Sequence, residues 1–62
     1  MTKFRDIHQA QMFDFIGPDH YIAFCVKISA RRYRDRKGKI HRVQSINLPV
    51  FAREVEFFKK NS

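Results

Sequence analysis

The chain has few of the residues on which several common kinds of site depend. Its 62 residues include two glycines, two prolines, one cysteine and no tryptophan. A single cysteine excludes a disulfide within the chain, and two separated glycines exclude a glycine-rich phosphate loop. No apolar stretch approaches the roughly 18 residues that span a membrane. We therefore expect one domain, residues 1–62, in the cytoplasm and without membrane association.

The histidines do not form a pattern typical of a metal or catalytic site. His8, His20 and His41 lie in three different segments. Their spacing from Cys25 is not that of zinc ligands. Motifs of paired carboxylates or activated nucleophiles are also missing, so the sequence predicts no catalytic residue, no metal site and no cofactor. One enzymatic alternative stays open, a small ribonuclease that uses arginine, His41 and Tyr33 in place of carboxylates.

Apolar residues are plentiful enough for a folded core. Hydrophobic residues make up 44% of the chain and aromatic residues 15%. That content is too high for a disordered tail. A domain of this size buries only about 60% of the surface that its unfolded chain exposes. Since the core is small and lacks disulfides, we expect a homodimer.

Positive charge is concentrated in one segment. The chain carries 13 Lys and Arg residues against 6 Asp and Glu residues, a net charge of +7. Residues 27–42 hold eight of these cations and one carboxylate, so this segment alone accounts for the net charge. A dense positive field is typical of surfaces that bind polyphosphate, because each neutralised phosphate releases counterions. A solvated basic loop and a docking surface for an acidic protein are the alternatives.

Residues 21–33 alternate in the manner of a half-buried strand. The side chains expected to face the core are those of Ile22, Phe24, Val26, Ile28 and Ala30. Those expected to face outward are Tyr21, Ala23, Cys25, Lys27, Ser29, Arg31 and Tyr33. The Asp and Gly of residues 35–38 favour a turn, so residues 40–48 are predicted to return as the antiparallel partner.

The two ends of the chain are predicted to differ. Residues 1–10 are expected to form an arm or a short helix, and residues 11–16 a strand that turns at Gly17 and Pro18. Pro49 suits the first position of a helix, and the apolar stripe of Phe51, Val55 and Phe58 has helical spacing. The predicted fold is α+β, a small antiparallel sheet of about three strands with a C-terminal amphipathic helix on one face.

The outward face of this predicted sheet mixes aromatic, cationic and short polar side chains, a composition that suits nucleic acid. Aromatic rings stack on bases, and Lys and Arg neutralise phosphates. A basic two-stranded ribbon can also enter the major groove of duplex DNA. The predicted nucleic-acid-binding residues are Lys27, Arg31, Arg32, Tyr33, Arg34, Arg36, Lys37, Lys39, His41 and Arg42. DNA is favoured over RNA.

Two family resemblances point in the same direction. Residues 26–33, the turn at 35–38, and Ser-Ile-Asn-Leu-Pro at 45–49 leading into residues 51–58 resemble single-stranded nucleic-acid-binding proteins of the positive cofactor four and Pur type. This resemblance covers about the last 35 residues. It implies a dimer whose curved sheets bind single strands, with Lys27, Arg31, Tyr33 and Arg36 at the matching basic and aromatic positions.

The second resemblance lies in the basic segment alone. Residues 32–42 resemble the amino-terminal arm-binding domains of phage integrases, which implies three strands, a helix and the reading of duplex DNA. The sequence thus predicts a small, non-catalytic nucleic-acid-binding protein with a basic hairpin, of a regulatory kind found in phages and mobile elements. The alternative is an interaction protein or inhibitor whose basic hairpin docks on an acidic host protein.

Overall fold

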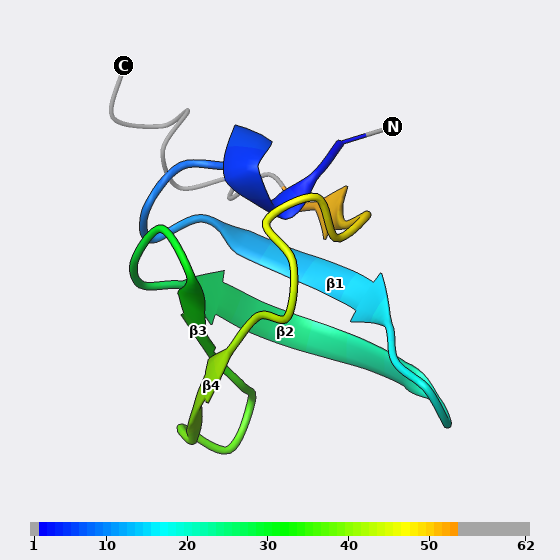
Figure 1. Ribbon diagram of the computed structural model, residues 1–62. Coiled ribbons are helices and arrows are strands. Elements are labelled where there is room, and N and C mark those ends of the chain that lie inside the picture. Colours follow the sequence, from blue (N-terminus) through cyan, green and yellow to red (C-terminus); the bar gives the residue numbers. More distant parts are fainter. Residues whose placement is uncertain (1, 54–62) are drawn as a thin grey trace.

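The computed structural model describes residues 2–53, which form a five-stranded antiparallel sheet (Figure 1). The strands are β1 (Met12–Ile16), β2 (Tyr21–Lys27), β3 (Arg32–Arg34), β4 (Ile40–Arg42) and β5 (Phe51–Ala52). Their order is β4-β3-β2-β1-β5, so four consecutive strands form a meander and the fifth returns to the far side of β1. A single 3-10 turn, η1 (Phe4–Asp6), precedes the sheet in the segment expected to form an arm or short helix.

The predicted first strand and its turn are confirmed. β1 begins within a residue of the expected position and ends at Ile16. The turn closes where the Gly17 N–H donates to the carbonyl of His20, at 2.9 Å. A β-carbon at Gly17 would lie 2.7 Å from Cδ1 of Ile22 and 3.0 Å from the carbonyl oxygen of His20, so a larger residue there would force the Ile22 side chain to move.

A bulge interrupts the pairing of β1 with β2. The paired residues are Met12 with Val26, Phe13 with Cys25, Phe15 with Ile22, and Ile16 with Tyr21. Two residues of β2, Ala23 and Phe24, therefore lie opposite the single residue Asp14. Phe24 has a φ of 61°, a backbone conformation that bulky residues seldom adopt. The extra residue reverses the side-chain alternation for the rest of β2.

This reversal makes the predicted facing of residues 24–27 wrong. Cys25 is fully buried and Lys27 is 7% exposed, whereas Phe24 is 39% exposed. Simple alternation from Ile22 had placed Phe24 and Val26 inside and Cys25 and Lys27 outside. The hydrophobic pattern could not reveal the bulge, because Phe and Cys are both apolar and either could fill the core.

The long strand predicted over residues 21–33 is in fact two strands. The chain reverses over residues 28–31, and β3 pairs with β2 through Val26 opposite Arg34 and Lys27 opposite Tyr33. The Ile28 N–H donates to the carbonyl of Arg32 at 3.1 Å across this reversal. Residues 28–31 contain neither glycine nor proline, so the two strongest sequence signals of a turn are absent.

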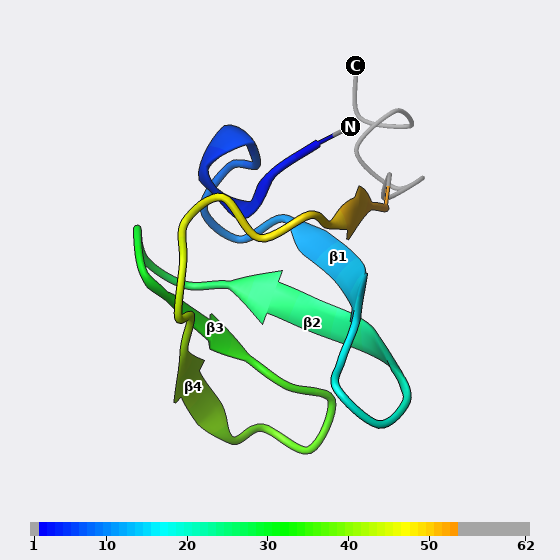
Figure 2. The same cartoon turned by 45° about the vertical axis from the view of Figure 1, so that its right-hand side comes forward.

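The turn at residues 35–38 is confirmed, but the strand after it is shorter than predicted. Oδ1 of Asp35 accepts hydrogen bonds from the backbone N–H groups of Lys37 and Lys39, both at 2.9 Å, and Gly38 has a φ of 90°. β4 ends at Arg42, where residues 40–48 were expected to be strand. The following segment connects β4 with β5 (Figure 2), and its Val43, Ile46, Leu48 and Val50 join the hydrophobic core.

The helix predicted to start at Pro49 is wrong in the part that the structure describes. Pro49 forms an antiparallel bridge with Lys3, and β5 pairs with β1 through Ala52 opposite Phe13 and Phe51 opposite Asp14. Proline is compatible with such an edge position as well as with a helix start. Residues 2–53 are therefore all-β, not α+β, and the rest of the predicted helix, including Val55 and Phe58, lies outside the described residues.

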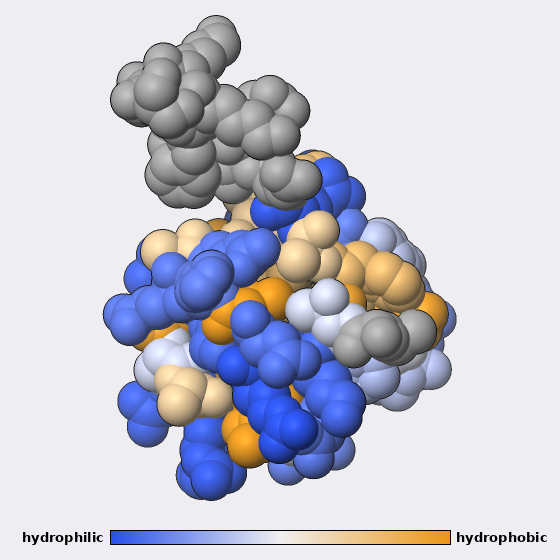
Figure 3. Space-filling view, turned by 90° about the horizontal axis from the view of Figure 1, so that it is seen from above, coloured by the Kyte–Doolittle hydropathy of each residue, from blue (hydrophilic) through white to orange (hydrophobic). Residues whose placement is uncertain are grey.

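One hydrophobic cluster fills the inner side of the sheet. Its buried members are Phe4, Ile7, Phe13, Phe15, Cys25, Val43 and Val50, with Ile22, Tyr33, Ile46 and Leu48 packed against them. Nζ of Lys27 lies inside the fold and donates to the carbonyls of Phe4 and Ile7, both at 2.9 Å. Burial raises the pKa of the Cys25 thiol to about 11. Seen from above, hydrophilic side chains cover much of the surface and hydrophobic ones show between them (Figure 3).

Within residues 2–53 we find no helix with the length and apolar character needed to cross a membrane.

Candidate nucleic-acid interface

The side of the sheet that faces away from the core is the candidate binding surface, here called the outer face. Counting outward from the buried Phe13, Phe15 and Cys25, the strand register assigns its residues. They are Met12, Asp14, Ile16, Tyr21, Phe24, Val26, Arg32, Arg34, Ile40, Arg42 and Phe51. Its β3 and β4 part carries arginines, and its β1, β2 and β5 part carries aromatic rings.

The cationic part belongs to the β3–β4 hairpin. We call its exposed cations the basic hairpin: Arg31, Arg32, Arg34, Arg36, Lys37, Lys39 and Arg42. Arg32 and Arg42 are direct cross-strand partners, although like charges at such positions repel. No carboxylate within residues 2–53 forms an ion pair with any of these seven cations. The hairpin thus holds concentrated positive charge that the described part of the chain leaves uncompensated.

The aromatic part is built around Phe24. The guanidinium of Arg53 lies 4.3 Å from the centre of the Phe24 ring, and that of Arg36 lies 5.3 Å from it. Both are distances at which a cation is attracted to the face of an aromatic ring. Tyr21 and Phe51 form a second pair on the same face, with ring centres 6.2 Å apart. The outer face therefore combines exposed rings with guanidinium groups.

Asp14 connects the residues of the aromatic part through hydrogen bonds. Although it is only 3% exposed, its carboxylate accepts from the Tyr21 hydroxyl at 2.6 Å and from the Phe24 N–H at 3.0 Å. Arg53 adds a two-pronged contact, with Nε and Nη2 each 2.7 Å from a carboxylate oxygen. These hydrogen bonds, that from Arg53 above all, hold the pKa of Asp14 well below its usual range. The site is thereby fixed to β1, β2 and β5 at once.

Three of the sequence-predicted binding residues, Lys27, Tyr33 and His41, lie on the inner side of the sheet. Lys27 is buried and its ammonium is bonded to backbone carbonyls. Tyr33 packs its ring edge-on against Phe13 and Phe15, with ring centres 5.8 and 5.5 Å apart. The His41 ring stacks on the Tyr33 ring, with ring centres 5.2 Å apart. The remaining seven predicted residues are those of the basic hairpin, which the structure brings together.

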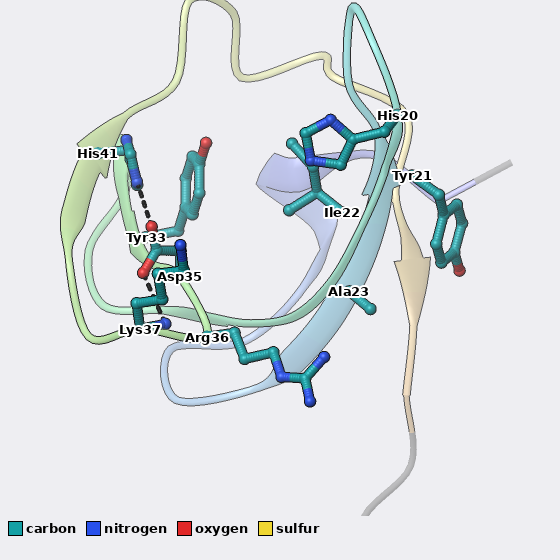
Figure 4. Close-up of a pocket in the computed structure, with 9 residues that line it drawn as sticks. All are labelled: His20, Tyr21, Ile22, Ala23, Tyr33, Asp35, Arg36, Lys37 and His41. Carbon is teal, nitrogen blue, oxygen red and sulfur yellow. Dashed lines mark hydrogen bonds and ion pairs between the residues drawn. The ribbon is translucent and has the colours of Figure 1, made fainter.

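Tyr33 and His41 instead line a groove of about 440 Å³ between the start of β2 and the β3–β4 hairpin. In Figure 4 these two rings stand side by side, and His20 and Ile22 lie across from them. Nε2 of His41 lies 2.7 Å from Oδ2 of Asp35, and this contact lowers the pKa of Asp35. Arg36 and Lys37 line the same groove, so a phosphate ester placed there would meet two cations and two imidazoles.

Sequence reasoning missed Phe24, Phe51, Asp14 and Arg53 as members of the site. Phe24 was assigned to the core, and Phe51 and Arg53 to a helix. Asp14 offered one usable signal, because a carboxylate between Phe13 and Phe15 in a strand needs a partner. The identity of that partner depends on where β5 returns, which no local pattern encodes.

Residues 2–53 contain no group of three or more His, Cys, Asp or Glu side chains that could hold a metal ion. Comparison with known proteins finds no matching family model, curated protein or solved structure. The resemblances to single-strand-binding proteins and to integrase arm-binding domains therefore stay predictions.

Proposed function

We propose that this protein binds nucleic acid without catalysing a reaction, holding phosphates on the basic hairpin. The observation that carries the proposal is the cross-strand pair of Arg32 and Arg42, two like charges that lie opposite each other on an exposed face. No carboxylate within residues 2–53 forms an ion pair with either of them. Such a pair costs stability in the free protein. A phosphate bound between two guanidinium groups would relieve the repulsion and form charge-assisted hydrogen bonds.

The construction of the hairpin supports this function. Asp35 braces the turn by accepting two backbone hydrogen bonds, so its carboxylate is used within the turn and does not neutralise the arginines. The hairpin therefore presents its cations on a short, fixed support. Fixed donors bind phosphate with less loss of side-chain entropy than donors on a free loop. We propose DNA ahead of RNA, and the cytoplasm as the location, where an unpaired cysteine such as Cys25 stays reduced.

Fluorescence anisotropy with matched single-stranded DNA, duplex DNA and RNA, repeated over a range of salt, tests the proposal. Four to six phosphate contacts would give a slope of log affinity against log salt of about −3 to −5. Arg32→Ala, Arg34→Ala and Arg42→Ala should each reduce that slope by about one. Arg5→Ala, an exposed cation in η1 and so away from the hairpin, is the matched control and should leave the slope unchanged.

Two results would contradict the proposal. Wild-type protein that binds none of the three nucleic acids at low salt would favour the alternative, in which the basic hairpin docks on an acidic host protein. An equal effect of the Arg5 and Arg34 substitutions would show that net charge matters and the hairpin does not.

A second candidate function, RNA cleavage, is favoured by the groove alone. His41, held by Asp35, and His20 line the same groove, with the Tyr33 ring between them in Figure 4. Arg36 and Lys37 line this groove too. One imidazole could take the proton of a ribose 2′-hydroxyl as its oxygen attacks phosphorus, and the other could protonate the departing 5′-oxygen. End-labelled RNA incubated with wild type and with His41→Ala tests this candidate. Intact RNA, or cleavage that survives the substitution, would exclude it.

A further inference from the structure

We propose that Phe24 is a stacking site for an unpaired nucleobase, which makes the outer face selective for single strands. The inference builds on the proposed nucleic-acid binding and specifies its ligand. The ligand is one flipped-out or single-stranded base whose neighbouring phosphates lie on the basic hairpin. Bases in a duplex are already paired and stacked, so they cannot offer a face to this ring.

The bulge in β2 is what presents the ring. Without it, alternation from Ile22 would turn Phe24 into the core. With it, Phe24 adopts a φ of 61° and the residue is 39% exposed on the outer face. Exposing a large apolar side chain is unfavourable, and so is a left-handed backbone at a bulky residue. Strained backbone positions of this kind concentrate at functional sites. A stacked base would cover apolar surface that the described part of the fold leaves open.

Asp14 makes the position rigid before any ligand arrives. One carboxylate oxygen accepts from the Phe24 N–H, which fixes the bulge, and both oxygens bind Arg53, which fixes the guanidinium over the ring. The ring and the Arg53 guanidinium are therefore already placed in the free protein. Binding to such a preformed platform loses little conformational entropy.

Arg36 links the platform to the basic hairpin. Its guanidinium lies 5.3 Å from the Phe24 ring centre, but no carboxylate within residues 2–53 holds it there, in contrast to Arg53. The Arg36 guanidinium can leave the Phe24 ring to bind a phosphate, and a base can then stack on the ring in its place. One nucleotide would then be held at both its base and its phosphate.

The absence of tryptophan from the chain allows a direct test. Phe24→Trp creates a single indole at the proposed stacking site, and a base stacked on it should quench its fluorescence. We expect strong quenching by a short single-stranded oligonucleotide and little change with a duplex of the same sequence. Equal signals from the two, or none from the single strand despite binding, would overturn the stacking site.

Affinity measurements on three further variants complete the test. Phe24→Leu keeps apolar bulk but removes the π face, so single-strand affinity should fall about 5- to 150-fold, the range of one lost base stack. Its salt slope and duplex affinity should stay the same, because no phosphate contact is lost. Phe24→Tyr should bind as wild type. Gln9→Ala changes an exposed residue between η1 and β1, away from the outer face, and is the neutral control.

The outcomes separate this inference from the proposed function. If Phe24→Leu binds single strands as wild type does while Arg34→Ala weakens them, the stacking site is wrong and phosphate binding stands. If wild type binds no nucleic acid at low salt, both are wrong. Circular dichroism and urea unfolding of each variant show whether a loss of binding is a loss of folding, and in that case the Phe24→Trp quenching alone decides.

Discussion

Lys27 donates two hydrogen bonds inside the protein, and both acceptors are backbone carbonyls of the opening segment. The ammonium also lies 4.7 Å from the centre of the Phe4 ring. The Lys27 side chain thus links the end of β2 to η1 through hydrogen bonds inside the fold. No carboxylate within residues 2–53 forms an ion pair with Lys27, so these two backbone oxygens accept hydrogen bonds from its charge instead.

We expect Lys27→Ala to lower the free energy of unfolding by about 2–4 kcal/mol. The substitution removes the Lys27 donor from the carbonyl of Ile7, and an unsatisfied buried carbonyl costs roughly 1–3 kcal/mol. The carbonyl of Phe4 still accepts from the Ile7 N–H, and the rest of the loss comes from the buried aliphatic part of the lysine side chain. Urea unfolding followed by circular dichroism measures the change. Lys39→Ala, which removes an exposed lysine of the turn, should change stability by less than about 0.5 kcal/mol. Similar losses from the two substitutions would contradict the internal role of Lys27.

Asp14 should make the fold sensitive to acid. Its pKa is lowered in the folded protein, chiefly by the hydrogen bonds from Arg53, so its contribution to stability is present above its unfolded pKa of about 3.9 and is lost as the pH falls below that value. Asp14→Asn should flatten this acid dependence and cost about 2 kcal/mol near neutral pH, a typical value for hydrogen bonds to a charged group. Urea unfolding over a pH series measures both effects. An unchanged acid limb in Asp14→Asn would assign the dependence to Asp35, whose pKa is also lowered.

For single residues, the sequence predicts which side chains are exposed better than it predicts their hydrogen-bond partners. The seven cations of the basic hairpin were identified correctly as surface charge, because Arg and Lys without nearby carboxylates are seldom buried. The burial of Lys27 was not predictable, since its acceptors are backbone atoms and carry no side-chain signature. The same holds for Asp14, whose partners Tyr21 and Arg53 lie 7 and 39 residues away along the chain.

Among the elements, the β3–β4 hairpin has the clearest dependence on a single residue. Gly38 has a φ of 90°, and a β-carbon added there would meet no atom within 4 Å. The cost of Gly38→Ala is therefore conformational, about 1 kcal/mol. Gly38→Asn should cost less, because asparagine tolerates left-handed backbone, and Gly38→Val should cost more. Thermal unfolding of the three variants gives the order, and a different order would place the strain elsewhere.

The elements that the sequence revealed are those whose ends carry glycine, proline or aspartate. β1, the turn at Gly17 and the turn at residues 35–38 were predicted on that basis, and the structure confirms them. The reversal at residues 28–31 has no such residue, and the bulge at Ala23 and Phe24 lies inside an apolar run. Pro49 was read as a helix start because its fixed φ fits both a helix and an edge strand, and the return of the chain to Lys3 decided between them.

For the molecule as a whole, the small core bears on assembly. Seven buried hydrophobic side chains form the core of residues 2–53, and large apolar residues such as Ile16 and Phe51 are exposed. We expect a homodimer, as inferred from chain length. If folding and association are coupled, the melting temperature should rise with protein concentration over the micromolar range. A melting temperature that is independent of concentration, together with a monomer mass by sedimentation, would contradict the dimer.

The charge distribution of the whole molecule was predictable, but its relation to the aromatic rings was not. The cations lie in one stretch of sequence and remain together in space. Phe24 and Arg53 meet only because β5 crosses back to β1 and the bulge turns a core position outward. Those are long-range events, so a reading of local pattern finds half of the candidate site.

The buried thiol of Cys25 is a natural chemical probe of how often the sheet opens. Because the side chain is inaccessible and its pKa is raised to about 11, an alkylating reagent near pH 8 reacts with it only in molecules whose β1–β2 pairing has opened. The rate of mass gain therefore counts opening events under native conditions, without an introduced label. A rate that follows urea stability would describe a sheet that opens all at once, whereas a much faster rate would describe one that opens at the bulge beside Cys25.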